Sequence, residues 1–272
     1  MQERRRIASN VNDSKNTRLS VLEAIDEGDV RKDVLVHLNR YLKTCETIIE
    51  LGNKLKRPLR ILDVGCGNLY IPVIFYKAYQ VKKSDYIEVY KGVDIDDICL
   101  DKFNSTQARV VEKLNVITEV KDLTVNPKFK EKNGYYDLII WFENIEHIKP
   151  EFVEPITKEL SRLLSKEGVM LASTPNATGS REKLPVDHVY EWSYKELSIL
   201  FSKYFSIIEN TGIVIQIPFF KKHIKGRVDQ EELMNIYESF KACMGNTFLC
   251  IALAPLVPPE LSKNVFWKLG RK

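Results

Sequence analysis

Short apolar runs alternate with amphipathic segments along most of the chain. The runs have the length and apolar character of buried strands, and they are Leu59–Val64, Tyr86–Ile95, Val116–Val120, Tyr136–Trp141 and Val169–Ser173. Segments with helical periodicity separate them, notably Asp97–Leu114 and Phe152–Leu164. This alternation predicts an α/β fold with a doubly wound, mostly parallel sheet and helices on both of its faces.

Further elements flank this core. Apolar residues recur at helical spacing over Leu35–Ile49 and predict an N-terminal helix that Gly52 and Pro58 close. Ser206–Val214 and Thr247–Ala254 are predicted as the last two of seven strands. The expected organisation is a doubly wound domain at 58–258 with a helical extension at 1–57, an insertion at about 216–246 and a basic tail at 259–272.

The composition excludes several classes of protein. Of the 272 residues 44% are hydrophobic and 29% charged, which argues against a disordered or collagen-like chain. The net charge of +4 does not indicate a polyanion partner. The longest apolar stretch, Phe248–Val257, is too short to span a bilayer, and the first ten residues lack the apolar core of a secretory signal. Together with five scattered cysteines, these features predict a cytoplasmic protein with no membrane partner, and they leave its oligomeric state open.

Glycines and acidic residues follow the predicted strands at the point where each strand ends. Asp63, Gly65 and Gly67 come at the end of the first strand, Asp94 at the end of the second, and Asp122 after the third. Ligands of open α/β sheets bind at this edge, where glycines let backbone N–H groups approach and an acid can accept ribose hydroxyls. Taken singly, each residue also fits an ordinary turn or helix cap. Their joint occurrence predicts a nucleoside-binding crevice.

These motifs resemble those of the class I S-adenosylmethionine-dependent methyltransferases, which have a Rossmann-like fold. The matching segments are LDVGCGN, YKGVDID, VKDL and YYDLIIWFENIEHI, followed by LSRLLSKEGVMLASTPN. The resemblance implies that S-adenosylmethionine is bound by Asp63, Gly65, Cys66, Gly67, Asp94, Ile95, Asp122 and Leu123. The chain departs from the family at Leu69, where a glycine is usual and where a Cβ could crowd the methionine part. A dinucleotide dehydrogenase is the structural rival, but Tyr70 breaks its GxGxxG pattern.

A second group of polar residues follows the fourth and fifth strands. If the chain turns into a helix after Trp141, then Glu143, Glu146 and His147 share one helical face, and His188 can join them across the crevice. Carboxylates and imidazoles together suit a divalent cation such as Mg²⁺ or Mn²⁺. The alternative is that Glu146 and His147 cap a helix while His188 packs on Trp192.

This second group, with DHVYEWSYKEL after it, resembles the metal-dependent methyltransferases of the small-RNA 3′-terminal ribose 2′-hydroxyl. The ubiquinone-biosynthesis O-methyltransferases share the Glu-x-x-Glu-His segment and a downstream histidine. The resemblance implies that Glu143, Glu146, His147 and His188 bind the cation, with Glu146, His147 and His188 as the catalytic residues. A histidine that is not a ligand would serve as the proton acceptor.

The acceptor is less constrained. The segment Pro218–Arg227 combines two phenylalanines with four basic residues, a combination that either binds nucleic acid or forms a lid with solvated lysines. Because the net charge is modest and no RNA-binding module is visible, we expect metal-assisted O-methylation of a small hydroxylated molecule. The alternatives are 2′-O-methylation of RNA, metal-independent methylation of nitrogen or carbon on a metabolite, and a non-catalytic protein that only binds S-adenosylmethionine.

Overall fold

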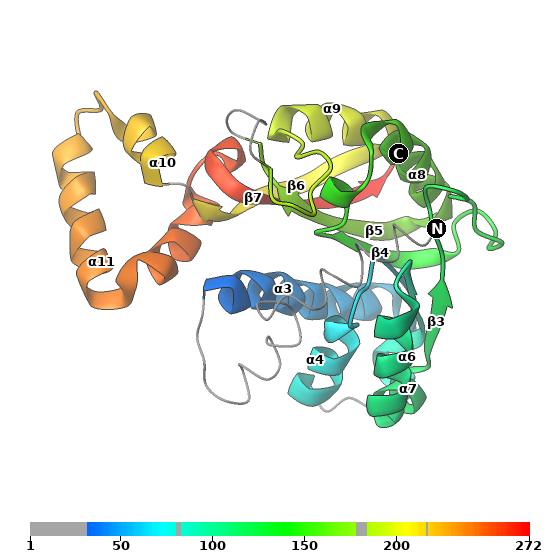
Figure 1. The fold of residues 1–272 in the computed structure, drawn as a ribbon. Helices are drawn as coiled ribbons and strands as arrows, with labels where there is room; N and C mark the ends of the chain where they lie inside the picture. The colour runs from blue at the N-terminus through cyan, green and yellow to red at the C-terminus, as the bar shows by residue number, and fades with distance from the viewer. Residues whose placement is uncertain (1–31, 80–82, 178–183, 216) are drawn as a thin grey trace.

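The protein is built around one seven-stranded sheet (Figure 1). The structure, a computed structural model, describes residues 32–79, 83–177, 184–215 and 217–272. The strand order is β3-β2-β1-β4-β5-β7-β6, and β7 runs antiparallel to both of its neighbours while the other pairs are parallel. The strands are β1 (Leu59–Val64), β2 (Ile87–Asp94), β3 (Val116–Val120), β4 (Tyr136–Phe142), β5 (Leu164–Pro175), β6 (Phe205–Ile215) and β7 (Ser262–Arg271). The predicted α/β class and its mostly parallel, seven-stranded sheet are confirmed.

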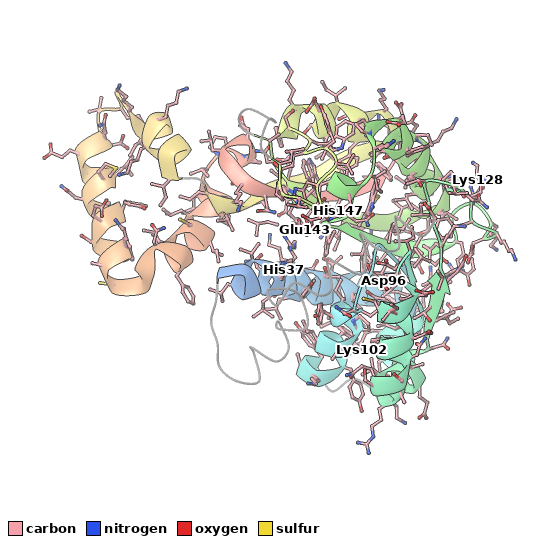
Figure 2. All side chains as sticks on the ribbon, viewed as in Figure 1. His37, Asp96, Lys102, Lys128, Glu143 and His147 are labelled. Carbon is pink, nitrogen blue, oxygen red and sulfur yellow. The ribbon has the colours of Figure 1, made fainter. Side chains whose placement is uncertain are left out.

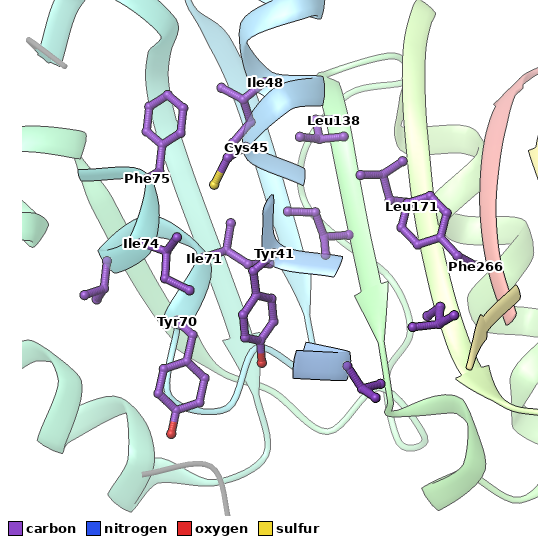
Figure 3. Close-up of a cluster of buried hydrophobic side chains, with 14 of the residues drawn as sticks. Tyr41, Cys45, Ile48, Tyr70, Ile71, Ile74, Phe75, Leu138, Leu171 and Phe266 are labelled. Carbon is purple, nitrogen blue, oxygen red and sulfur yellow. The ribbon is translucent and has the colours of Figure 1, made fainter. Parts of the chain in front are cut away.

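Helices cover both faces of the sheet. One face carries α3 (Lys32–Leu55), α4 (Tyr70–Tyr79), α6 (Asp97–Thr106) and α7 (Ala108–Leu114), with the short α5 (Lys83–Tyr86) leading into β2. The other carries α8 (Pro150–Leu163) and α9 (Tyr194–Tyr204). Because successive strand residues point to opposite faces, Ile61 lies in the first core and Leu62 in the second. Figure 3 shows part of the first core, where α3 and α4 side chains meet β4 and β5.

Helix α3 is longer than the sequence predicts. It continues through Gly52 to Leu55. A side chain at position 52 would press on the Tyr86 ring, so glycine permits a close contact here and does not end the helix. The chain leaves the helix at Lys56, whose φ is 53°, just before Pro58. Cys45 and Ile48 of α3 are fully buried, which makes this helix part of the domain core. Residues 1–31 of the predicted extension lie outside the described residues.

The C-terminal part differs most from the prediction. Residues 247–254 are not a strand: they belong largely to α11 (Gln230–Leu253), which bends at Gly245. With α10 (Ile217–Ile224) it forms an arm that projects from the sheet (Figure 1), while Leu249 and Cys250 near the end of α11 are buried in the first core. Short 3₁₀ turns at Ala254–Leu256 and Pro259–Leu261 lead to β7, so the segment predicted as a basic tail holds a strand inside the sheet. An apolar run of eight residues suits a buried helix as well as a strand, which explains the error. Within the described ranges, no helix has both the length and the apolar character of a membrane span.

Candidate active site

A sharp turn follows β1 and forms the floor of the site. Gly65 and Gly67 have φ values of 64° and 50°, and a side chain on Gly65 would overlap that of Asn144, so glycine is required there. The N–H of Gly65 donates to the Val93 carbonyl at 2.9 Å, and the N–H of Gly67 donates to Asp94 Oδ2 at 2.8 Å. The turn is thereby tied to the end of β2.

Two adjoining cavities open at this edge of the sheet. The larger, of about 390 Å³, falls in the size range of sites for small organic ligands. It is lined by six of the eight predicted donor-binding residues, namely Gly65, Gly67, Asp94, Ile95, Asp122 and Leu123. The other two, Asp63 and Cys66, line a smaller cavity of about 40 Å³ that shares Gly65 and Gly67 with the first. The structure therefore brings all eight to one place.

The two acids of the larger cavity are held by backbone N–H groups. Asp94 accepts from Gly67 through Oδ2 and from the N–H of Asp96 through Oδ1 at 3.0 Å. Asp122 Oδ1 accepts from both the N–H and the hydroxyl of Thr124, at 2.8 and 2.6 Å. A carboxylate oxygen has two lone pairs, so both acids can accept further hydrogen bonds while their orientation stays fixed.

Asp63 lies deeper, at the end of β1. Its side chain is buried, and Oδ2 accepts a 2.6 Å hydrogen bond from the Tyr90 hydroxyl. Burial raises the pKa of the Asp63 carboxyl to about 7, helped by the charge of Asp94 and opposed by the hydrogen bond from Tyr90. Asp63 thus changes charge near neutral pH.

Leu69, the departure from the family pattern, does not enter either cavity. Its φ of 53° shows why glycine suits this position, yet its side chain is fully buried. It fills the space over Gly92, where an added Cβ would lie 2.6 Å from Leu69 Cδ2. Leu69 is absent from the residues that line the two cavities.

A histidine cluster adjoins the larger cavity through His147, which lines it. Glu146, His147 and His188 each offer one ligand atom, and these atoms lie within 4.8 Å of one another. Glu146 is buried and accepts a 2.8 Å hydrogen bond from the Thr174 hydroxyl through Oε2, and the two imidazole rings are 5.1 Å apart. The structure therefore brings together three of the four predicted metal ligands.

The hydrogen bonds of the two histidines define which ring nitrogen is available. His147 Nδ1 lies 2.8 Å from the Asp187 carbonyl oxygen, and His188 Nδ1 lies 2.7 Å from Glu191 Oε1. A carbonyl oxygen and a carboxylate only accept, so each Nδ1 carries the proton and each Nε2 keeps its lone pair. This is the outer-shell arrangement found around metal-binding histidines.

Glu143, the fourth predicted ligand, does not join this cluster. The chain forms only a 3₁₀ turn at Ile145–His147, and Glu143 precedes it with a φ of 44°, so the predicted common helical face does not exist. Glu143 Oε1 instead lies 3.0 Å from Arg40 Nη1 (Figure 2 labels Glu143, His147 and His37). The expectation of four clustered ligands rested on a helix that the left-handed backbone of Glu143 prevents.

Arg40 and His37 of α3 line the smaller cavity and were missed in the sequence. The predicted apolar stripe of this helix included Leu42, which is 37% exposed, whereas Arg40 is only 1% exposed. Arg40 follows the buried Val36 by four residues and precedes the buried Thr44 by four. A charged residue at that spacing on a buried face was the available signal.

The insertion lies apart from both cavities. Lys221 and Lys222 are exposed on α10, and among described residues the arm supplies none that lines either cavity. Arg227 is paired with Asp229 at 2.8 Å. The side chains of Phe219 and Phe220 lie outside the described residues.

Solved structures with a similar fold come from several enzymes. They include the [4+2]-cyclase SpnF (TM-score 0.52, 12% identity, 84% of this chain and 81% of that chain). A TehB-like SAM-dependent methyltransferase from Corynebacterium glutamicum ATCC 13032 Kitasato gives a TM-score of 0.49 at 16% identity, over 83% of this chain and 87% of that chain. The methyltransferase domain of bacterial-CtHen1-CN gives a TM-score of 0.48 at 16% identity, over 84% of this chain and 97% of that chain. At these identities the likeness concerns the fold alone.

No curated protein matches the chain significantly. A family model described as a methyltransferase domain matches residues 36–206, which is more than half of the chain and runs from α3 to the start of β6. The matched segment contains all eight predicted donor-binding residues, which line the two cavities, and the histidine cluster. The chain therefore belongs to the methyltransferase-domain family, which confirms the resemblance to the class I S-adenosylmethionine-dependent methyltransferases.

Proposed function

We propose that the protein methylates a hydroxyl group of a small molecule with the help of a divalent cation of the Mg²⁺ or Mn²⁺ kind. The observation that supports this proposal is the cluster of Glu146, His147 and His188, which adjoins the donor cavity through His147. Two imidazole nitrogens and a carboxylate oxygen form a mixed donor set for a first-row divalent cation, and Mn²⁺ is the one that combines such ligands with the preference for oxygen that it shares with Mg²⁺. A bound cation lowers the pKa of a coordinated hydroxyl and orients it.

The residues of the chain have separate tasks in this proposal. Thr174 holds the Glu146 carboxylate, while the Asp187 carbonyl and Glu191 bind Nδ1 of His147 and His188, so that Nε2 of each ring would serve the cation. Asp94 and Asp122, which line the same cavity as His147, would accept hydrogen bonds from the nucleoside of the donor. The rate gain comes mainly from holding donor and acceptor in line.

A small acceptor is favoured over RNA by the position of the basic residues. Lys221 and Lys222 stand on the arm, and Arg227 is already paired with Asp229. A polynucleotide would need free basic groups along its path away from the reacting hydroxyl, because phosphate contacts provide most of its affinity. The experiment must therefore distinguish methylation of a small acceptor from 2′-O-methylation of RNA.

We also propose that the protein works in the cytoplasm, as the scattered cysteines suggested. All five cysteines are free thiols, and Cys66 and Cys99 border the donor cavities. A reducing compartment keeps such thiols intact.

The experiment combines metal binding with transfer. Mn²⁺ binding is measured by electron paramagnetic resonance on the purified protein, on Glu146→Gln and His188→Ala, and on the exposed control Glu154→Gln. Methyl transfer from labelled S-adenosylmethionine is then followed with a panel of small hydroxylated compounds and with short RNA oligonucleotides, with and without chelator.

We expect one Mn²⁺ to bind to the parent and the control, binding to weaken at least tenfold in the two cluster variants, and chelator to stop transfer to a small acceptor. Transfer that is insensitive to chelator, in a protein that binds no Mn²⁺, would overturn the role of the cation. Transfer to RNA alone would overturn the small acceptor.

A further inference from the structure

Residues 184–192 form a strap that belongs to both parts of the site. They contain no helix or strand, and they lead from a turn at Pro185–His188 into α9. Asp187 and Val189 line the larger cavity, whereas His188 between them belongs to the histidine cluster. One short segment therefore supplies part of the wall of the donor cavity and one member of the cluster.

The other two members of the cluster hold this strap in place. The backbone carbonyl of Glu146 accepts hydrogen bonds from the N–H groups of Val189 and Tyr190, at 2.8 and 3.1 Å. His147 donates through Nδ1 to the Asp187 carbonyl at 2.8 Å. The position of the strap and the geometry of the cluster are thus parts of one hydrogen-bonded unit.

Hydrogen bonds hold the middle of the strap more than apolar packing does. Val186 is fully exposed, and Val189 is 47% exposed. On the side of α9, the Tyr190 hydroxyl donates to Glu196 Oε1 at 2.8 Å, and Glu196 also accepts from the Ser193 N–H at 2.8 Å at the start of that helix. A segment with few buried apolar contacts opens at a low free-energy cost, so the loss of one such anchor changes how often the strap is closed.

We propose that the strap couples binding of the donor to binding of the cation, with Tyr190 as the positioning residue that holds the strap between α9 and Glu146. Both ligands need the strap closed: the donor for the wall at Asp187 and Val189, and the cation for His188. A ligand that closes the strap removes the ordering cost for the second ligand, so each raises the affinity for the other by the same factor. This inference rests on the proposed function, since it needs a cation at the cluster.

The coupling is measured in both directions. Calorimetry gives the affinity for S-adenosylhomocysteine without and with saturating Mn²⁺, and electron paramagnetic resonance gives the affinity for Mn²⁺ without and with S-adenosylhomocysteine. The variants are Tyr190→Phe, which removes the hydrogen bond to Glu196, and the matched control Tyr204→Phe. Tyr204, at the other end of α9, likewise donates through its hydroxyl to a glutamate, Glu154, at 2.9 Å. Hydrogen exchange at the N–H groups of Val189 and Tyr190 reports directly on closure of the strap.

In the parent, we expect Mn²⁺ and S-adenosylhomocysteine to raise each other's affinity by the same factor, about fivefold, and each to slow exchange at the strap. In Tyr190→Phe, S-adenosylhomocysteine alone should bind roughly three- to tenfold more weakly, as for one lost hydrogen bond, because the strap is more often open. Saturating Mn²⁺ should restore this affinity to within about twofold of the parent, because the cation closes the strap. A variant with a damaged cavity stays weak in Mn²⁺, whereas Tyr204→Phe should match the parent throughout.

The outcomes separate the strap from the cation site. If the parent binds Mn²⁺ but its affinity for S-adenosylhomocysteine is the same with and without Mn²⁺, the coupling is overturned while the proposed cation site stands. If Tyr190→Phe binds S-adenosylhomocysteine weakly and Mn²⁺ does not restore the affinity, the role of Tyr190 is overturned. A parent that binds no Mn²⁺ overturns the proposed role of the cation and the coupling together, and electron paramagnetic resonance detects this case before any donor is added.

Discussion

At the scale of single residues, the charge of Asp63 couples donor binding to pH. Burial raises the pKa of its carboxyl from 3.8 to about 7, so in the free protein it is mostly protonated below neutral pH. The resemblance implies that Asp63 holds the methionine part of the donor, whose ammonium stays charged in this range and would bind the ionised carboxylate better. We therefore expect the affinity for S-adenosylhomocysteine to rise roughly five- to tenfold between pH 6 and 7.5, as the ionised fraction grows.

Calorimetric titration at several pH values checks this, with Asp63→Asn as the variant that should show no such slope. A parent protein with pH-independent affinity would contradict the prediction.

The raised pKa of Asp63 also makes the stability of the protein depend on pH. Between the unfolded value near 4 and the folded value of about 7, the unfolded chain releases the proton first, so this residue lowers the stability of the free protein as pH rises.

Leu69 shows why a departure from a family pattern need not affect the ligand. Replacing it by glycine relieves a left-handed backbone, worth about 1–2 kcal/mol, but removes a fully buried side chain, worth about 2–5 kcal/mol. We expect Leu69→Gly to lower the free energy of unfolding by about 1–3 kcal/mol in urea titrations. Donor affinity should be unchanged, and tighter binding by the variant would show that Leu69 crowds the donor after all.

Among individual site residues, those that follow strands were predictable and those set by local backbone or by a distant helix were not. Asp94 and Asp122 were found because parallel strands end at one edge. Glu143 was grouped with the histidines on an assumed helix, which its positive φ rules out. Arg40 comes from a segment before the family motifs, and its pairing with Glu143 depends on how α3 packs. Periodicity alone does not reveal that packing.

At the scale of elements, a buried ion pair fixes the end of α3 to the sheet. Arg57 donates two hydrogen bonds, at 2.8 and 2.7 Å, to Asp137 of β4, which is fully buried. Burial alone would raise the pKa of Asp137, but the hydrogen bonds from Arg57 and from the N–H of Arg60 outweigh it and lower the pKa. The pair therefore contributes stability above the ordinary carboxyl pKa, and this contribution is lost as the pH falls through the lowered value.

Removing Arg57 leaves Asp137 buried with fewer partners. We expect Arg57→Gln to lower the free energy of unfolding by about 2–3 kcal/mol near neutral pH, less than for a fully buried pair because Arg57 is 40% exposed. Lys54→Gln, on the last turn of the same helix, is the control, since its pair with Glu167 is exposed and such pairs contribute about 0–1 kcal/mol. Equal effects of the two substitutions in denaturant titrations would contradict this ranking.

The elements themselves were predicted best where one signal dominated. β1 and β3 have the predicted limits, because each is a short apolar run between turns. Asp97–Leu114, expected as one helix, is two helices that meet at Gln107. β7 was not predicted, because polar and charged residues interrupt its apolar pattern. The last strand was predicted instead at the more apolar run 247–254, which lies largely in α11.

At the scale of the whole molecule, donor binding should not require the arm. The two stretches of chain that lead into and out of the arm lie close together: a Cβ on Gly212 of β6 would lie 3.1 Å from the Ala254 carbonyl oxygen just after α11. We expect replacement of residues 217–252 by a short glycine–serine linker to lower the free energy of unfolding, because it removes Leu249 and Cys250 from the first core, and to keep S-adenosylhomocysteine affinity within twofold. Circular dichroism and calorimetry test this; a folded variant that no longer binds the donor would mean that the arm reaches the cavity.

The antiparallel position of β7 also affects how the protein is made. Among the strands that the structure describes, β6 pairs with β7 alone, and the arm is encoded between them, so β6 lacks this partner while the ribosome synthesises the arm. At roughly 5–20 residues per second this interval lasts several seconds, during which an apolar strand edge is exposed to other nascent chains. We therefore expect newly made protein to be most prone to aggregation in this interval, and slow synthesis across the arm to lengthen it.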